Sequence, residues 1–254
     1  MSILLKNGRI LQTPITPLQL PNLKLYLSSQ MMYQYSNDTP MPNFVDYSGN
    51  NYNAVNNTIG EQPLFKPNSF GKAAGLQFDG SNDKMNIASN NIFQNINQYT
   101  VQIACKRTVL SITSNIFYSL HNNATTNSVR FGVTFMNTGN IQIFVLRSDT
   151  DPLLIFQYPS NDLNPHFIQC TLNPTNYTVS VYHDGVLMGN IQLASSGNLN
   201  NTPSISNIGW FQPVNISGSF GTSNISEISV SQSYSNPSII ASQYQGWLQR
   251  TGYL

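Results

Sequence analysis

The sequence predicts an all-β protein in which two antiparallel sheets pack face to face as a sandwich. Short apolar runs alternate with polar residues at a period of two, and turn residues separate these runs at regular intervals. Hydrophobic residues make up 40% of the 254 positions, enough for a large core. Sandwiches of this length commonly form one domain, so we expect a single sandwich over residues 23–254.

The first 22 residues are expected to form an extended arm. Pro14, Pro17 and Pro21 are spaced through this segment. Each proline fixes φ and removes a backbone N–H donor, which excludes a long helix or a central strand here. Such an arm either covers an edge of the sandwich or reaches a neighbouring subunit, and the sequence leaves both open.

Runs with a period of two are the clearest predicted strands. They cover residues 24–27, 75–78, 84–87, 100–105, 129–135, 141–146, 167–172, 178–182 and 225–230. Between them, residues 137–140 (N-T-G-N), residues 173–176 (N-P-T-N) and the pair Asp184-Gly185 predict tight turns. Each of these segments contains a residue suited to positive φ or a proline that fixes the turn.

One helix is predicted, near the C-terminal end of the sequence. Asn236 can cap it and Pro237 suits the first helical position. Ile240, Tyr244 and Trp247 then recur at the spacing of one helix face. We expect this apolar stripe to pack on the sandwich, although it could instead dock a partner.

The composition limits the classes of partner. Charged residues are only 8% of the chain, against roughly 25% in an average domain, and 11 basic residues nearly balance 10 acidic ones. Nucleic acid is therefore not an expected partner, because no basic field would attract phosphates. A surface of amides and hydroxyls suits sugars or neighbouring subunits, although an AT-rich genome would also enrich asparagine. The N-terminal apolar run is too short for a Sec signal, and no stretch predicts membrane insertion.

Two cysteines, Cys105 and Cys170, fall in predicted strands. We expect buried free thiols in preference to a disulfide, because free cysteine is among the most buried residue types. The chain has no C-x-x-C pair, and its cysteines and histidines do not cluster along the sequence, so no zinc site is predicted.

Four stretches, in order, resemble the laminin-G-like/concanavalin A-like jelly-roll family. They are residues 46–54 (D-Y-S-G-N-N-Y-N-A), residues 70–83 (F-G-K-A-A-G-L-Q-F-D-G-S-N-D), residues 179–187 (V-S-V-Y-H-D-G-V-L) and a closing set of Ile208-Gly209, Gly218, residues 225–227 (I-S-E) and the terminal helix. The resemblance implies a jelly-roll sandwich of the concanavalin A/laminin-G type. It also implies that Asp79-Gly80 and Asp184-Gly185 serve as turns, not as catalytic groups.

The resemblance raises the question of a structural calcium ion, the one cofactor considered. Calcium needs six to eight oxygen ligands, several of them carboxylates. The candidates are Asp46, Asn50 and Glu227. Where the family often has an Asp-Glu pair near its end, this chain has Ser226-Glu227, which weakens the expectation. Ordinary hydrogen bonding within the loop is the alternative.

The sequence predicts that the protein is not an enzyme. Glycosidases that resemble this broad fold carry two catalytic carboxylates in an E-x-D-x-E motif on one strand. This chain has only two glutamates, Glu61 and Glu227, and they lie far apart in the sequence. The closest acidic pairs, at positions 79 and 83 and at positions 149 and 151, fall in predicted turns. The three histidines are scattered, and no G-x-S-x-G motif is present.

A sugar site needs an aromatic face with amide and hydroxyl partners nearby. The best cluster by this criterion is Trp210, Phe211, Gln212 and Asn215. Packing of Trp210 in the core or at an edge is the alternative. Tyr33 and Tyr35 beside Asn37 form a weaker cluster.

These observations favour a non-enzymatic virion structural or display protein, such as a phage capsid decoration, fibre or tail component. We expect it to be made in the host cytoplasm and displayed at the virion surface, with other virion proteins or copies of itself as partners and with adhesion to a host-surface glycan. A stand-alone carbohydrate-binding, lectin-like module is the alternative.

Overall fold

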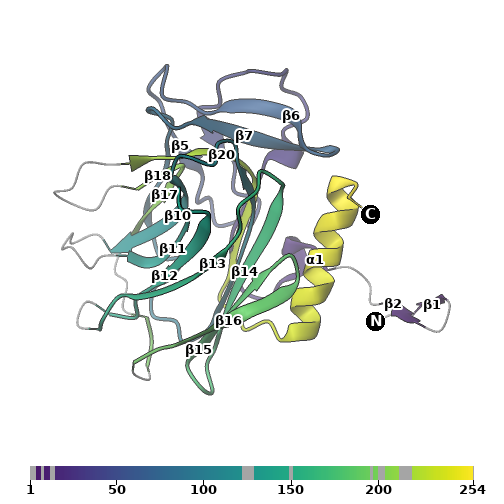
Figure 1. Ribbon diagram of the computed structural model, residues 1–254, viewed down its shortest axis with the longest axis vertical. Coiled ribbons are helices and arrows are strands. Elements are labelled where there is room, and N and C mark those ends of the chain that lie inside the picture. Colours follow the sequence, from purple (N-terminus) through teal and green to yellow (C-terminus); the bar gives the residue numbers. More distant parts are fainter. Residues whose placement is uncertain are drawn as a thin grey trace.

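A computed structural model describes residues 4–6, 9–11, 15–121, 129–148, 151–194, 197–199, 204–211 and 219–253. Two curved antiparallel sheets face each other, and one helix lies on the outside of one of them (Figure 1). The expected all-β sandwich with one C-terminal helix is confirmed.

One sheet, here called the front sheet, follows the order β13 (Leu154–Pro159), β12 (Asn140–Val145), β11 (Val129–Phe135), β10 (Ser114–His121), β17 (Ser204–Ile208), β8 (Met85–Asn90), β5 (Ala54–Val55) and β4 (Asn43–Phe44). The other, the helix-covered sheet, follows the order β16 (Val186–Gln192), β15 (Thr178–His183), β14 (His166–Asn173), β9 (Tyr99–Arg107), β20 (Thr222–Ser231), β7 (Ala73–Asp79) and β6 (Leu64–Phe70). β3 (Leu23–Ser28) also pairs with β20. Every predicted run matches one of these strands, although the runs 84–87 and 141–146 each extend one residue beyond β8 and β12. The period of two identified them because it places alternate side chains on opposite faces of a sheet.

The strand register decides which residues enter the core. In the ladder of β14 with β9, Ile168 lies opposite Ile103 and Cys170 lies opposite Val101. These side chains point into the space between the sheets, together with Cys105. Both thiols are free and buried, as expected, and burial raises the pKa of each well above its usual range.

Aromatic side chains fill the centre of the sandwich. Phe131 stacks on Phe93 with ring centroids 5.9 Å apart and meets the ring of Tyr99 edge-on at 6.0 Å. Phe117, on the neighbouring strand β10, contacts the ring of Phe131. All four are buried, so this cluster joins both sheets into one core.

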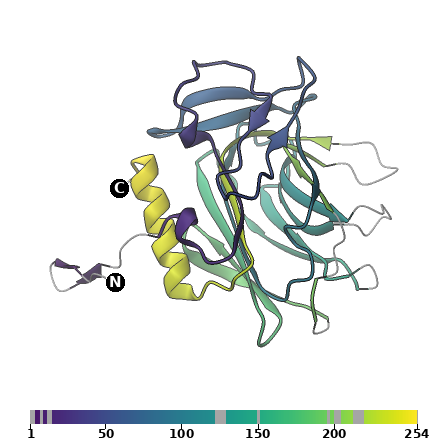
Figure 2. The same cartoon turned by 180° about the vertical axis from the view of Figure 1, so that it is seen from behind.

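The helix α1 (Pro237–Thr251) packs on the outer face of the helix-covered sheet (Figures 1 and 2). Its first turn is capped as expected, since the Asn236 side chain accepts a hydrogen bond from the Ile239 N–H. Trp247 stacks on Phe167 with centroids 5.4 Å apart. Gly252, at φ +74°, then ends the helix in the left-handed conformation that favours glycine.

The N-terminal segment is not extended throughout. β1 (Leu4–Lys6) pairs with β2 (Arg9–Leu11) outside both large sheets. Pro17 opens a single 3-10 turn, η1 (Pro17–Gln19). The first residue of a helical turn makes no N–H hydrogen bond within the turn, so a proline there removes none. The Asn22 carbonyl then accepts from the Gln232 N–H at 3.0 Å. The last residues of the N-terminal segment therefore lie beside the end of β20.

Three smaller elements complete the described chain. η2 (Ser29–Met31) follows β3, and β18 (Trp210–Phe211) pairs with β19 (Ser219–Phe220). Among the described residues, no helix combines the length and the apolar character needed to cross a bilayer.

Candidate functional site

A hollow of about 260 Å³ lies where η2, the β6–β7 hairpin and the last turn of α1 meet, a junction that can be followed in Figure 1. We call it the donor hollow. Its lining residues are Gln30, Tyr33, Phe65, Pro67, Lys72, Ala73, Ala74 and Arg250. They come from three distant parts of the sequence, which only the folded sandwich brings together.

Hydrogen bonds fix the walls of the donor hollow. The Ser29 hydroxyl lies 2.7 Å from the Ala74 carbonyl oxygen and 2.9 Å from the Ser226 carbonyl oxygen, which holds η2 against β7 and β20. The Lys72 N–H donates to the Thr251 carbonyl at 2.8 Å and ties the hairpin turn to the helix. The hairpin therefore approaches the helix end closely, and η2 closes the remaining side.

The donor hollow contains hydrogen-bond donors that lack acceptors. Arg250 Nη2 donates to Glu227 Oε1 at 2.6 Å, while Arg250 Nε and Nη1 are buried and have no partner in the described part of the chain. The same holds for Gln30 Nε2. Leaving a buried donor unpaired costs about 1–3 kcal/mol. An acceptor for these three donor atoms is therefore missing from the described part of the chain.

Glu227 holds the arginine in place from behind. It is only 2% exposed, and its second oxygen accepts from the Tyr26 hydroxyl at 3.2 Å. Burial, together with the Glu227 charge, raises the pKa of Tyr26 far above its usual value, so this tyrosine remains a donor. The Tyr26 hydroxyl thus holds the Glu227 carboxylate, which in turn orients the guanidinium of Arg250.

An exposed aromatic ring stands beside these donors. Tyr33 is 87% exposed, the largest exposed fraction of any aromatic side chain among the described residues. The neighbouring Tyr35 contacts Phe65 with ring centroids 6.2 Å apart. A tyrosine that offers its ring to solvent while donors lie nearby is suited to stacking on a polar ligand.

A second hollow, of about 490 Å³, shares Pro67 with the first. We call it the amide hollow. Its other lining residues are Asn37, Lys66, Asn68, Ser69, Gln77 and Asn224. Ser69 Oγ and Asn224 Oδ1 are buried there without partners in the described ranges. The two hollows are therefore adjacent, and both are lined by residues that carry buried polar atoms without partners in the described ranges.

The predicted aromatic cluster is arranged differently. The Trp210 indole N–H donates to Asn86 Oδ1 at 2.9 Å, its ring stacks with Phe220 at 6.2 Å, and Lys84 Nζ lies 5.7 Å from its centroid. Phe211 stacks on Tyr118 at 4.2 Å. Gln212 and Asn215 lie outside the described residues. A sugar-binding role for these four residues stays a prediction.

The predicted calcium ligands are engaged with protein donors. Asp46 Oδ1 accepts from the backbone N–H groups of Tyr26 and Ser48, both at 2.9 Å, and Oδ2 accepts from the Ser48 hydroxyl at 2.8 Å and the Tyr52 N–H at 2.9 Å. Such donors at both oxygens do not suit a cation. Asn50 donates to the Leu23 carbonyl at 3.1 Å. The carboxylate of Glu227 pairs with Arg250, so the three residues form no common ligand set, and calcium binding stays a prediction.

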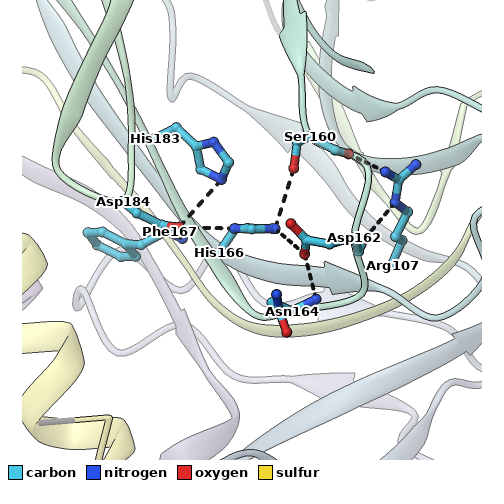
Figure 3. A network of polar contacts seen from close by, with 8 residues as sticks. All are labelled: Arg107, Ser160, Asp162, Asn164, His166, Phe167, His183 and Asp184. Atoms are coloured by element: carbon cyan, nitrogen blue, oxygen red, sulfur yellow. Dashed lines mark hydrogen bonds and ion pairs between the residues drawn. The ribbon is translucent and has the colours of Figure 1, made fainter. Parts of the chain in front are cut away.

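A separate polar network lies where the chain crosses from β13 in the front sheet to β14 in the helix-covered sheet (Figure 3). The buried His166 places Nδ1 3.0 Å from Asp184 Oδ2 and Nε2 3.0 Å from Asp162 Oδ1. Ser160 Oγ lies 3.4 Å from the same Nε2. The contacts from Ser160 to His166 and from His166 to Asp184 thus resemble those between the serine, histidine and aspartate of a hydrolase triad.

The protonation of His166 opposes that reading. Burial lowers the pKa of His166, but the carboxylates of Asp184 and Asp162 outweigh burial and raise it overall. The two carboxylates therefore stabilise the protonated ring, which would have to lose a proton before it could accept one from Ser160. This works against activation of a nucleophile.

His183 joins the network from the end of β15. Its ring centroid lies 4.3 Å from that of His166. Burial, reinforced by the nearby His166, lowers the pKa of His183, so this ring is neutral. The expectation of scattered histidines is wrong for this pair. β14 and β15 are neighbours, and Ile168 lies directly opposite His183, a proximity that sequence spacing does not reveal.

The loop that carries Asp162 is held by Arg107 at the end of β9. Its guanidinium donates to the carbonyl of Asp162 at 3.0 Å, to that of Met136 at 3.1 Å and to that of Ser160. Its Cζ atom also lies 5.5 Å from the Phe135 ring centroid. This arginine is 1% exposed, so it fixes the loop and is not available to a ligand.

Comparison with known proteins gives a structural likeness only. No protein-family model matches the chain, and no curated protein matches it. A Trypanosoma rangeli sialidase, solved in complex with 2-keto-3-deoxy-D-glycero-D-galacto-2,3-difluoro-nononic acid, aligns with a TM-score of 0.63 and 16% identity over 94% of this chain and 36% of that chain. The botulinum neurotoxin serotype D ligand-binding domain, solved in complex with N-acetylneuraminic acid, aligns with a TM-score of 0.61 and 16% identity over 89% of this chain and 51% of that chain.

The binding domain of botulinum neurotoxin DC, solved in complex with rat synaptotagmin II, aligns with a TM-score of 0.60 and 14% identity over 88% of this chain and 51% of that chain. The chain therefore spans about a third to a half of the length of these solved chains. At such identities the likeness establishes the fold alone. This chain has a lectin-like β-sandwich fold.

Proposed function

We propose that this chain is a non-enzymatic carbohydrate-binding domain whose donor hollow takes the carboxylate of an acidic sugar. The observation that supports it most strongly is a set of buried donor atoms beside the exposed Tyr33, Nε and Nη1 of Arg250 and Nε2 of Gln30, that have no acceptor among the described residues. A carboxylate would satisfy these donors, because arginine binds carboxylates through paired, charge-assisted hydrogen bonds.

The charge of the donor hollow favours an anion. Lys72 and Arg250 line it, and no carboxylate is among the described residues that do so. Glu227 offsets part of the arginine charge, which leaves the Lys72 ammonium as the second cation. The sugar ring would rest against Tyr33 and Pro67, and a following sugar would meet the Asn, Gln and Ser side chains of the amide hollow.

Two solved structures with this fold add support, since both are complexes with acidic sugars: N-acetylneuraminic acid on a botulinum neurotoxin domain and a difluoro-nononic acid on a sialidase. One of the two is an enzyme. We place this chain with the non-enzymatic group, because the described lining of the donor hollow offers no acid and the carboxylates of Asp184 and Asp162 raise the pKa of His166.

A glycan array tests the proposal. The protein should retain glycans that end in a carboxylate-bearing sugar at least about tenfold better than their neutral counterparts, a difference of about 1.4 kcal/mol. Lys72→Gln should remove this preference, and Lys84→Gln, which removes the same charge beside Trp210, should not. Equal retention of acidic and neutral glycans, or an unchanged preference in Lys72→Gln, would contradict the proposal.

A second proposal concerns where the domain works. We propose that it is a virion display component, a capsid decoration, fibre or tail protein, attached through its N-terminal segment to other virion proteins or to copies of itself. The small charged fraction of 8% and the β1–β2 pair outside the sandwich support this. Native mass spectrometry should find oligomers of the full chain that a deletion of residues 1–14 abolishes. A monomeric full chain, or a deletion that still assembles, would count against self-association through this segment.

A further inference from the structure

Three potential metal ligands converge beside the sandwich core, away from both hollows. His166 Nδ1 lies 3.0 Å from Asp184 Oδ2, and His183 Nε2 lies 3.5 Å from the same oxygen. All three ligand atoms lie within 4.8 Å of one another. Figure 3 shows both imidazole rings directed at the Asp184 carboxylate.

The spacing of these atoms fits a shared cation. Zinc binds imidazole nitrogen and carboxylate oxygen at about 2.0–2.2 Å. Two such ligands at an angle of 90° to 110° are roughly 3.0–3.5 Å apart, by the geometry of those bond lengths. The two distances to Asp184 Oδ2 fall in this interval, so a cation could enter with small movements of the rings.

An ion pair alone does not account for the cluster. Asp162 and Asp184 are sufficient partners for His166, whereas His183 Nε2 is buried and makes no hydrogen bond in the described part of the chain. At 3.5 Å from the Asp184 carboxylate it is placed next to the anion without a hydrogen bond. A metal ion between these atoms would give His183 Nε2 a partner.

The supporting contacts hold the ligands in fixed orientations. Asp184, at φ +51°, and Gly185, at φ +77°, form the turn after β15. In this turn, Asp184 Oδ1 accepts from the Phe167 N–H at 2.7 Å, which leaves Oδ2 facing the rings. On the other side of the His166 ring, Asp162 accepts from Nε2. A carboxylate behind a ligating histidine is the usual outer partner in zinc sites.

We propose that His166 Nδ1, His183 Nε2 and Asp184 Oδ2 bind a divalent transition-metal ion of the zinc class, with water in the fourth position; the ion takes the place of any proton on His166 Nδ1, which is released to solvent. Two imidazoles and one carboxylate suit this class better than calcium or magnesium, which prefer oxygen ligands. The Asp184 side chain is 32% exposed, which gives the ion an entry path. The bound ion would join β14 to the β15–β16 turn and is independent of sugar binding.

Titration of the chelator-treated full chain with Zn²⁺ and with Co²⁺ tests the site. We expect about one ion per chain, a rise in Tm with added zinc, and a cobalt absorption spectrum of a tetrahedral site. His183→Gln should weaken zinc binding at least about 100-fold with an unchanged circular dichroism spectrum, since this side chain is not needed for the His166 ion pairs. Asp162→Asn should weaken it by about 10- to 100-fold, as expected of an outer partner.

Ca²⁺ serves as the control ion and should leave Tm unchanged. The absence of saturable zinc binding would overturn the proposal. Zinc binding that His183→Gln leaves intact would also overturn it, because the ion would then lie elsewhere. Asp184→Asn gives a second check of the same kind wherever it folds normally, and the His183 variant alone suffices to decide if it does not.

Discussion

The Trp210 cluster and the donor hollow both place an aromatic ring beside polar groups, but they differ in what remains unsatisfied. At Trp210 the indole N–H has an acceptor, and Phe220 and Lys84 contact the ring. At the donor hollow, Tyr33 is 87% exposed, and Arg250 Nε and Nη1 have no acceptor in the described part of the chain. Residue type alone therefore does not mark a binding site. The proposed binding site differs from packed structure in its unmet hydrogen-bonding capacity next to an open ring.

The largest expected effect tests the support of the donor hollow. Arg250→Ala leaves Glu227 buried and without its ion-pair partner, and we expect it to lower the free energy of unfolding by about 3 kcal/mol. Denaturant unfolding measures this. Glu227→Gln combined with Arg250→Ala should recover part of the loss, because no buried charge then remains. A single variant as stable as the wild type would contradict the buried pair.

On the other side of the comparison, Trp210→Ala should act on stability and not on binding. The half-buried ring packs against Phe220, and we expect a loss of about 2 kcal/mol in the free energy of unfolding. Glycan retention, measured below the unfolding transition, should match that of the wild type. Loss of glycan retention with unchanged stability would instead indicate that the sugar binds at Trp210.

Tyr33→Ala should show the opposite behaviour. The exposed ring contributes little to folding, so we expect the free energy of unfolding to change by less than about 0.5 kcal/mol. Affinity for an acidic glycan should fall about tenfold or more, and Tyr33→Phe should retain most of it. Calorimetric titration measures both variants. Wild-type affinity in Tyr33→Ala would show that the Tyr33 ring does not contribute to glycan binding.

The smallest expected effect lies beside Lys84, on the Trp210 side. Burial, and to a lesser degree the nearby Asp79, raise the pKa of Asp83 to about 6. A raised folded-state pKa favours the folded protein below the unfolded value near 4, and this contribution is lost as pH rises through 6. Because Ser81 and Asn82 next to it are exposed, we expect only about 1 kcal/mol.

Asp83→Asn should remove this pH dependence. The wild type should lose about 1 kcal/mol relative to the variant between pH 4 and pH 7, as measured by Tm at a series of pH values. Glycan affinity should not differ between the two proteins at any pH. Parallel stability curves for wild type and variant would show that Asp83 titrates normally.

The sequence predicted the scaffold better than the site, for a physical reason. Strands and the capped helix follow from local patterns: the period of two over residues 225–230, or Asn236 followed by Pro237. Gln30, Lys72 and Arg250 share no local pattern, since they meet only after the sandwich closes. Tyr33 was recognisable as an aromatic near an amide, but its exposure was not.

The histidine pair shows the same limit. His166 and His183 belong to adjacent strands in the register that pairs Ile168 with His183. The spacing of 17 residues between the histidines carries no signal of this kind, because it depends on the length of the intervening hairpin. The Asp184-Gly185 turn was predicted correctly, yet the direction of its carboxylate depends on the Phe167 N–H, a contact across strands.

Nuclear magnetic resonance of side-chain N–H groups compares the two regions most directly. In one 1H–15N spectrum, the Arg250 Nε–H signal reports on the donor hollow and the Trp210 indole N–H signal reports on the predicted aromatic cluster. On titration with an oligosaccharide that ends in a carboxylate-bearing sugar, we expect the Arg250 signal to shift to saturation and the Trp210 signal to stay in place. A saturable shift at Trp210 with no change at Arg250 would contradict the proposed site.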